Sequence, residues 1–390
     1  MSQRLISRSP DLKRLRDEGY DVTVRGAHLL LAQVPYLNQA GEVCRGTLIS
    51  ELTLSGDRTA APSSHVVMFS GETPCDKSGA ALPIINSGAA TPISDGVVAN
   101  FVFSSKPPGG YKDYYDKMTA YVNMLAHQAR AVDESVSPTV FPAVAEDDAE
   151  GIFHYYDTAT SRAGIDAVAQ KLHVDKVAIV GLGGTGGYVL DLISKVPIGE
   201  IHLFDGDRFL NHNAFRAPGA ASLEELQRAL FKVDYFTARY SNMHRRIVAH
   251  PYFVTADHLG ELVGMDFVFL CVDSGAARGA IVSKLESAGV SFLDVGMGVQ
   301  EVGGALGGQL RATLSTDSQR DHVHRRVNLS ETDLPDDYDQ NIQVADLNAL
   351  NAALAVIKWK KTLGFYRDLE REHHSIYDID GNAVINEESA

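Results

Sequence analysis

The residues best suited to chemistry in this chain lie in a glycine-rich turn. The segment VAIVGLGGTGGYVLDLI, residues 177–193, joins a short apolar run to a helical apolar pattern, and Gly181, Gly183, Gly184 and Gly186 form GxGGxG at the junction. Glycines there let the backbone turn tightly and approach an anion, while the N–H groups and dipole of the following helix attract negative charge. The segment predicts a phosphate site, but by itself it fits NAD as well as ATP.

A second polar cluster follows the next expected strand. The sequence LFDGDRFLNHNAFRA, residues 203–217, contains Asp205, Asp207, Asn213 and Arg216. An acid at the end of this strand can hydrogen-bond a ribose hydroxyl, so Asp205 suits a dinucleotide and ATP equally well. The dinucleotide-binding pattern of a dehydrogenase, however, does not call for the asparagine and arginine that follow.

The elements that must position these residues alternate between strand and helix from residue 175 onward. The hydrophobic pattern predicts strands over 175–184, 200–207, 247–255, 266–274 and 290–298, with helices over 185–195, 226–245 and 276–288. This alternation is typical of an α/β fold with a parallel, doubly wound, Rossmann-like sheet. In such sheets the ligand lies beyond the carboxyl ends of the strands, where the motifs above occur.

The ordered set of motifs resembles the ThiF family, a fold shared by ubiquitin-activating enzymes and by bacterial activators of sulfur-carrier proteins. The family pattern is GxGGxG, then DxDxVxxSNLxRQ, a helix lysine and an Asp after a later apolar strand. In this chain FKVDYFTARYSNMHRRI supplies Lys232 and FVFLCVDS supplies Asp273. The resemblance covers roughly residues 155 to 310. Departures from the pattern remove no implied ionic contact; they are Phe209, His212, Ala214 and Ala217.

The resemblance implies an enzyme that uses ATP and Mg²⁺ to join a carboxylate to the α-phosphate, with release of pyrophosphate. Arg216 and Lys232 would hold phosphate oxygens, with Asn213 as a polar partner. Asp205 would hold the ribose, and Asp273 would ligate Mg²⁺, which prefers hard oxygen ligands. Protein catalysis of such a step consists mostly of positioning and charge neutralisation.

Two further site residues have open roles. In YYDTATSRAGIDAV, just before the first strand, the family places an arginine that reaches a phosphate, often across a dimer interface. Arg162 is the candidate, and the alternative is a solvated helix arginine. Asp207 either supports the site or caps a turn. Because the fold family typically pairs two such domains, we expect a homodimer.

The acceptor of the activated acyl group also stays open. The only cysteines are Cys44, Cys75 and Cys271, so the later half lacks the thioester-forming cysteine of ubiquitin-type activators and the four-cysteine zinc site of many sulfur-carrier activators. We expect Cys271 to be a small buried side chain. The acyl group passes directly to a partner, to a hydroxyl such as Ser315 or Ser318, or to Cys44 or Cys75. Direct transfer is slightly favoured, because hydroxyls need an activating base.

Composition excludes several classes of partner. A net charge of -15 argues against nucleic acid, and no apolar run approaches the roughly 20 residues that span a bilayer. The sparse cysteines and the charged start without a signal-peptide core favour a soluble cytoplasmic protein.

The acidic, proline-containing stretch at 137–151 predicts a domain boundary near residue 150. Residues 1–150 would form a small α+β accessory domain, with strands over 21–26, 28–37 and 46–56, loops over 55–110 and a helix over 111–132. LKRLRDEGYDV, VPYLN and FSSKPPGGYKDYYDKMT loosely resemble an uncharacterised module in front of bacterial ThiF-type domains. We expect it to dock a carrier protein or a downstream conjugating enzyme.

Residues 151–390 would then form an ATP-binding adenylation domain. The leading hypothesis is adenylation of the C-terminal carboxylate of a small ubiquitin-like or sulfur-carrier protein, as the activating step of a bacterial conjugation or sulfur-carrier pathway. The alternatives are an NAD(P)-linked oxidoreductase and a nucleotide-binding scaffold without turnover. Adenylation of a peptide or small molecule is a further branch.

Overall fold

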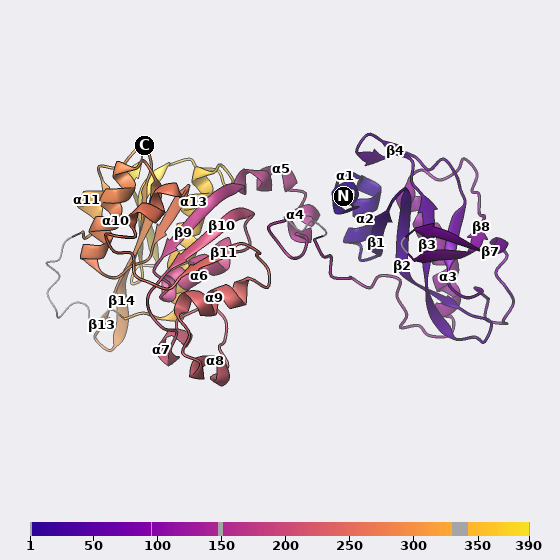
Figure 1. Cartoon of the computed structure of the whole chain (residues 1–390), viewed down its shortest axis with the longest axis horizontal. Coiled ribbons are helices and arrows are strands. Elements are labelled where there is room, and N and C mark those ends of the chain that lie inside the picture. Colours follow the sequence, from indigo (N-terminus) through magenta and orange to yellow (C-terminus); the bar gives the residue numbers. More distant parts are fainter. Residues whose placement is uncertain (1, 95, 147–150, 330–341, 390) are drawn as a thin grey trace. The chain divides into compact units, whose positions relative to one another are not determined.

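The computed structural model describes residues 2–94, 96–146, 151–329 and 342–389. These residues divide into two compact units (Figure 1). The first unit contains Met1–Gly151 and Tyr155–Gly164, and the second contains Ile152–His154 and Ile165–Ala390. No helix in the described ranges combines the length and the apolar character that crossing a membrane requires.

The first unit is built on a six-stranded antiparallel sheet in the order β1-β2-β3-β6-β8-β7. Helix α3 packs against this sheet through a buried stripe that includes Tyr114, Met118 and Tyr121. Its elements are α1 (Ser2–Arg8), α2 (Pro10–Asp17), β1 (Asp21–Arg25), β2 (His28–Leu37), β3 (Val43–Glu51), β4 (Leu54–Ser55), β5 (Arg58–Thr59), β6 (Val67–Ser70), β7 (Ile85–Ser94), β8 (Val97–Phe103), α3 (Tyr114–Arg130) and α4 (Thr158–Ala163).

The expectation that loops dominate residues 55–110 is wrong in part. Strands β6, β7 and β8 lie in this stretch and complete the sheet. The sequence hides them because β7, INSGAATPIS, is rich in small and polar residues and pairs with β8 through several register shifts. Cross-strand pairing decides such strands, and local β-propensity does not reveal it.

The second unit contains an eight-stranded sheet in the order β11-β10-β9-β12-β13-β14-β15-β16. The first five strands in this order are parallel, and the last three are joined antiparallel. Its strands are β9 (Val174–Val180), β10 (Ile198–Phe204), β11 (Ile247–His250), β12 (Phe267–Leu270), β13 (Ser291–Val302), β14 (Ala305–Ser315), β15 (Glu372–Asp378) and β16 (Ala383–Ser389).

Helices cover both faces of this sheet (Figure 1). Side chains of α6, α9 and α13 form one core with one sheet face, and those of α10 and α11 form a second core with the other. The helices are α5 (Asp166–Ala169), η1 (Gln170–Leu172), α6 (Gly184–Ile193), α7 (Asn211–Ala214), α8 (Leu223–Gln227), α9 (Lys232–Tyr240), η2 (Leu259–Gly264), α10 (Gly275–Ser287), α11 (Val323–Arg326) and α13 (Ala345–Thr362). The predicted doubly wound α/β fold is confirmed.

The antiparallel extension of the sheet begins at a two-residue turn. Gly303 and Gly304 connect β13 to β14, and both have positive φ, at 64° and 84°. Tight hairpin turns with positive φ at both central positions favour glycine strongly. The chain therefore reverses after β13 and adds β14, β15 and β16 beside the parallel strands.

The helix expected over 226–245 is two helices, α8 and α9. The chain between them pairs with the segment after β10, where the Phe209 N–H donates to the Leu230 carbonyl at 2.8 Å. The next such bond runs from the Lys232 N–H to the Asp207 carbonyl, also at 2.8 Å. This pairing interrupts the helix and starts α9 directly beside the end of β10.

Candidate nucleotide-binding site

At three positions of the glycine turn between β9 and α6, close packing leaves no room for a side chain. Gly181 has φ +89°, and a Cβ there would overlap the Cys271 carbonyl. A Cβ on Gly186 would overlap the Gly181 carbonyl, and one on Gly184 would overlap the Asn348 amide. Gly183 differs, because no described atom lies within 4 Å of its Cβ position. The space in front of Gly183, at the start of α6, is open to a ligand.

Asp205 organises this turn from the end of β10. Its side chain is only 6% exposed. Oδ2 accepts a 2.6 Å hydrogen bond from the Leu182 N–H, and Oδ1 accepts one of 2.8 Å from the Asp207 N–H. These two bonds hold the protein's own backbone, and the role of Asp205 toward a ribose stays a prediction.

Lys232 begins α9 and is held by two carboxylates. Its Nζ lies 2.7 Å from Asp207 Oδ2 and 3.5 Å from Asp205 Oδ2. The lysine is 5% exposed, whereas the side chain of Asp207 is 57% exposed. Asp207 therefore positions the lysine, and its role in supporting a nucleotide site stays a prediction.

Asn213 and Arg216 lie in and just after the short helix α7. Asn213 is buried, and its Oδ1 accepts a 2.9 Å hydrogen bond from the Leu210 N–H, which fixes the start of the helix. The Nε atom of Arg216 is buried and has no hydrogen-bond partner among the described residues. A buried cationic donor without a protein partner fits an anionic ligand.

Asp273 follows β12, and the charges of several candidate site residues affect its pKa. Burial in its surroundings raises the pKa of this carboxyl, and the nearby charges of Arg278, Arg216 and Lys232 oppose that rise. The charge of Asp205 adds to it. The predicted residues Asp205, Arg216 and Lys232 therefore lie close enough to Asp273 for their charges to act on it.

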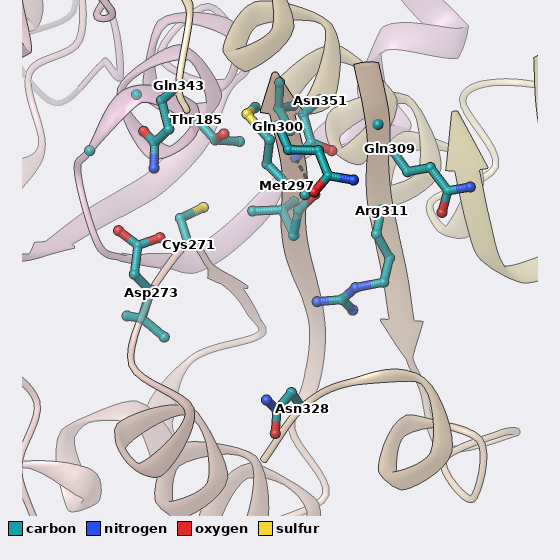
Figure 2. A pocket seen from close by; sticks show the side chains of 18 of the residues that line it. Thr185, Cys271, Asp273, Met297, Gln300, Gln309, Arg311, Asn328, Gln343 and Asn351 are labelled. Atoms are coloured by element: carbon teal, nitrogen blue, oxygen red, sulfur yellow. Dashed lines mark hydrogen bonds between the residues drawn. The ribbon is translucent and has the colours of Figure 1, made fainter. Parts of the chain in front are cut away.

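A cavity of about 810 Å³ lies at this edge. Figure 2 shows Asp273 and Cys271 after β12, Thr185 at the start of α6, and Met297 on β13 around it. The remaining lining residues come from the turn, from β13, β14 and β15, and from the ends of the helices: Gly183, Gly184, Val272, Arg278, Val295, Gly296, Gly298, Val299, Gln300, Gly308, Gln309, Arg311, Arg326, Asn328, Gln343, Asn351, Asp378 and Asp380.

Sequence reasoning missed a buried charge cluster behind this cavity. Asp294 on β13 is fully buried, and it lies 3.0 Å from Arg278 Nε and 2.6 Å from an Nη of Arg311. The guanidinium of Arg278 also donates to the carbonyls of Val272 and Asn328. The one available signal was an aspartate inside an apolar strand, since a buried charge requires partners.

Arg162 belongs to a different unit from the other candidate site residues. Arg162 belongs to α4 of the first unit, where its Nη2 donates to the Asp17 carbonyl at 2.6 Å. Its guanidinium also lies 5.9 Å from the centre of the Phe141 ring. A role for Arg162 across a dimer interface stays a prediction.

The structure places the candidate acyl acceptors differently. Ser315 is fully buried and pairs with Phe292 in the β13–β14 ladder, four residues along β14 from the cavity-lining Arg311. Ser318 is exposed and bonded to Thr316, and neither serine is among the described residues that line the cavity.

The three cysteines are all protonated more firmly than usual. Cys44 and Cys75 belong to the first unit, and burial raises the pKa of both thiols. Cys271 lines the cavity, where burial and the charges of Asp294 and Asp273 raise its pKa. Since the thiolate is the nucleophile, none of the three is prepared for attack.

Comparison with protein families gives two adjoining matches. The model described as "Domain of unknown function (DUF6791)" matches residues 10–158, and the model described as "ThiF family" matches residues 156–319. The second part of this chain is similar to the ThiF family over those residues. The expected resemblance, including the separate module in front, is confirmed.

Curated relatives of the ThiF domain include ubiquitin-like modifier-activating enzyme 5 from Culex quinquefasciatus, 28% identical over 161 residues, and from Gallus gallus, 29% identical over 164 residues. Each match covers 38% of this chain and 40% of the relative, so the similarity spans less than half of either protein.

Solved structures similar to the chain include Escherichia coli MccB with MccA-N7isoASN, at 17% identity and a TM-score of 0.47 over 57% of this chain and 67% of MccB. PaaA aligns at 17% identity and a TM-score of 0.45, over 71% of this chain and 92% of PaaA.

Proposed function

We propose that this chain is an adenylyltransferase that uses ATP and Mg²⁺ to activate the C-terminal carboxylate of a small ubiquitin-like or sulfur-carrier protein. The observation that carries the proposal is that Asp273, which lines the same cavity as Gly183, lies near enough to Arg216 and Lys232 for their charges to act on its pKa. Two cations and one carboxylate beside a helix N-terminus are suited to a metal-bound triphosphate.

The donor set fits a triphosphate. The N–H groups at the start of α6 face the space beyond Gly183. The buried Nε of Arg216 supplies a cationic donor that has no hydrogen-bond partner in the described ranges. The Nζ atom of Lys232 is 2.7 Å from the exposed carboxylate of Asp207. A phosphate oxygen would replace this carboxylate as the partner of the lysine. Arg216 and Lys232 would thus neutralise the charge of the phosphates.

The residues also fit Mg²⁺, which would withdraw charge from the phosphate oxygens. The described residues contain no group of three or more His, Cys, Asp or Glu side chains that could hold a metal ion by themselves. Mg²⁺ commonly binds through one or two carboxylates together with substrate phosphates. Asp273 is the carboxylate in position for that role.

The proposed reaction needs positioning more than acid–base chemistry. A carboxylate oxygen of the carrier attacks the α-phosphorus of ATP and forms a new P–O bond. The bond from the α-phosphorus to the bridging oxygen breaks, and pyrophosphate leaves with that electron pair. Because the attacking carboxylate is already ionised, no proton transfer is needed, and charge stabilisation dominates.

We also propose that the acyl adenylate passes directly to a partner. Burial of Ser315 and the raised pKa of the Cys271 thiol disfavour an acyl-enzyme at either position. The first unit would then dock the carrier or a conjugating enzyme, and the active form would be a cytoplasmic homodimer.

The test is ATP–pyrophosphate exchange in the presence of carrier proteins encoded by neighbouring genes. Wild-type protein should show carrier-dependent exchange, and Asp273→Asn should reduce it about 100- to 1,000-fold, which is typical for loss of a group that stabilises transition-state charge. Asp257→Asn, an exposed aspartate outside the cavity lining, is the matched control. Full exchange in Asp273→Asn, or none with any carrier, would count against the proposal.

A further inference from the structure

Strands β13, β14 and β15 present one continuous face to the cavity. In their ladders Gly296 pairs with Arg311, and Gln309 pairs with both Gly298 and Asp378. Directly paired residues in antiparallel strands project from the same face, and residues two apart repeat it. All five of these residues line the cavity.

The inner end of this face is positive. Arg278 and Arg311 share the single buried carboxylate of Asp294, so these three side chains together carry one net positive charge. Figure 2 shows the guanidinium of Arg311 projecting from its strand toward the side of the view on which Asp273 lies. This end of the face therefore lies toward the candidate nucleotide site.

The outer end is negative. Asp378 and Asp380 line the cavity, and within the described part of the chain neither forms an ion pair. Asp378 Oδ2 accepts a 2.9 Å hydrogen bond from the Gly381 N–H, which leaves its charge uncompensated. Arg326, a further charged residue of the lining, is already paired with Glu387 at 2.6 Å and with Glu388 at 2.9 Å.

A buried acceptor beside Gly296 has no hydrogen-bond partner among the described residues. Asn351 on α13 is 1% exposed and donates from Nδ2 to the Gly296 carbonyl at 3.0 Å. That bond fixes the amide, and Oδ1 has no hydrogen-bond partner among the described residues. Because buried acceptors are nearly always satisfied, this oxygen in the cavity wall points to a ligand N–H.

We propose that this face binds the extended tail of a polypeptide substrate, with its terminal carboxylate at the arginine end and a lysine or arginine beside Asp378 and Asp380. The inference rests on the proposed function and specifies its substrate. Successive levels of the face are two residues apart, about 6.8 Å. The basic residue therefore stands about two to four positions before the terminal carboxylate, in a tail whose last residues are small enough to lie over Gly296 and Gly298.

The experiment measures binding, so that it does not depend on turnover. Fluorescein-labelled octapeptides ending in Gly-Gly carry Arg, Ala or Glu at the third or the fourth position from the end. Fluorescence anisotropy with the full-length protein, Mg²⁺ and a non-hydrolysable ATP analogue gives each dissociation constant. The Arg peptide should bind about tenfold more tightly than the Glu peptide, as expected for hydrogen-bonded charge pairs.

The variants test the two carboxylates directly. Asp378→Asn combined with Asp380→Asn should reduce the Arg-over-Glu preference to less than about twofold, because the amides keep the shape and lose the charge. Asp378→Lys combined with Asp380→Lys should invert it. Glu301→Gln is the matched control, since Glu301 is an exposed carboxylate of the same hairpin that does not line the described cavity. Thermal melting confirms that each variant is folded.

Equal binding of the three peptides, no binding up to millimolar concentration, or an unchanged preference in the double variant would overturn the inference. The exchange assay separates it from the proposed function. Carrier-dependent exchange without a charge preference would support the proposed adenylation and contradict the proposed binding of a basic tail. A charge preference without exchange supports the tail site and removes adenylation.

Discussion

The Oδ2 atom of Asp205 accepts a 2.6 Å hydrogen bond from the backbone N–H of Leu182. This bond ties the end of β10 to the glycine turn that follows β9. The same carboxylate lies 3.5 Å from the Nζ atom of Lys232. One buried charge therefore helps to position both the glycine turn and the Lys232 cation, which are proposed to bind phosphate.

Replacing the carboxylate of Asp205 should weaken the positioning of both the glycine turn and Lys232. In Asp205→Asn the amide offers one acceptor oxygen, so one of the two backbone N–H groups that Asp205 now satisfies loses its partner. We expect the free energy of unfolding of the second unit to fall by about 2 kcal/mol and ATP binding to weaken. Calorimetry and ATP titration measure the two effects. The exposed Asp207→Asn should cost less than about 1 kcal/mol, and an equal loss in both variants would contradict this account.

Two glycines of the motif should separate ligand binding from packing. Gly183→Ala points a methyl group into open space, whereas Gly186→Ala forces one against the Gly181 carbonyl. The first variant should weaken ATP binding with little change in melting temperature. The second should destabilise the fold by about 1–3 kcal/mol, as overpacking does. Thermal melting with and without ATP distinguishes them, and a stability loss in Gly183→Ala as large as in Gly186→Ala would refute the distinction.

Lys117 in the first unit should reduce stability at neutral pH. It is 1% exposed, its Nζ donates to Ser50 Oγ at 2.9 Å, and burial lowers its pKa to about 8. Below pH 8 the folded protein holds a charged, buried lysine, and the free-energy penalty for removing that charge from water fully reduces its stability. Between pH 8 and about 10.5 the unfolded chain holds the proton that the folded chain has lost, so stability rises with pH.

Lys117→Met should therefore stabilise the first unit by about 3 kcal/mol at pH 7, and the gain should shrink as the pH approaches 10.5. Denaturant titrations across this pH range measure the difference. The exposed Lys112→Met serves as the control. A gain that does not change with pH would show that packing, and not the buried charge, is responsible.

His244 should make the second unit sensitive to acid. It is fully buried between the Ile198 carbonyl, 2.9 Å from Nε2, and the Arg246 N–H, 3.2 Å from Nδ1. Burial lowers its pKa to about 4. As the pH falls from about 6.5 toward 4, the unfolded chain takes up a proton and the folded chain does not, so up to about 3 kcal/mol of stability is lost. His244→Gln should flatten this dependence in denaturant titrations, and the exposed His212→Gln should not.

The ThiF motifs were predictable because each is local. GxGGxG occupies one strand–turn–helix junction, and Asp205, Lys232 and Asp273 stand at the ends of elements whose hydrophobic periods are clear. In a parallel sheet those ends meet at one edge, so their convergence followed from the order of elements. The strand–helix alternation likewise predicted the doubly wound sheet.

Only the tertiary structure decided which charges share partners and which residues reach the cavity. The pairing of Asp294 with Arg278 and Arg311, the distance of Ser315 from the cavity and the placement of Arg162 in the first unit depend on register, burial and contacts between segments far apart in the chain. A strand's hydrophobic pattern leaves its pairing partner open. The sequence likewise does not reveal which buried group will pair with a given charged side chain.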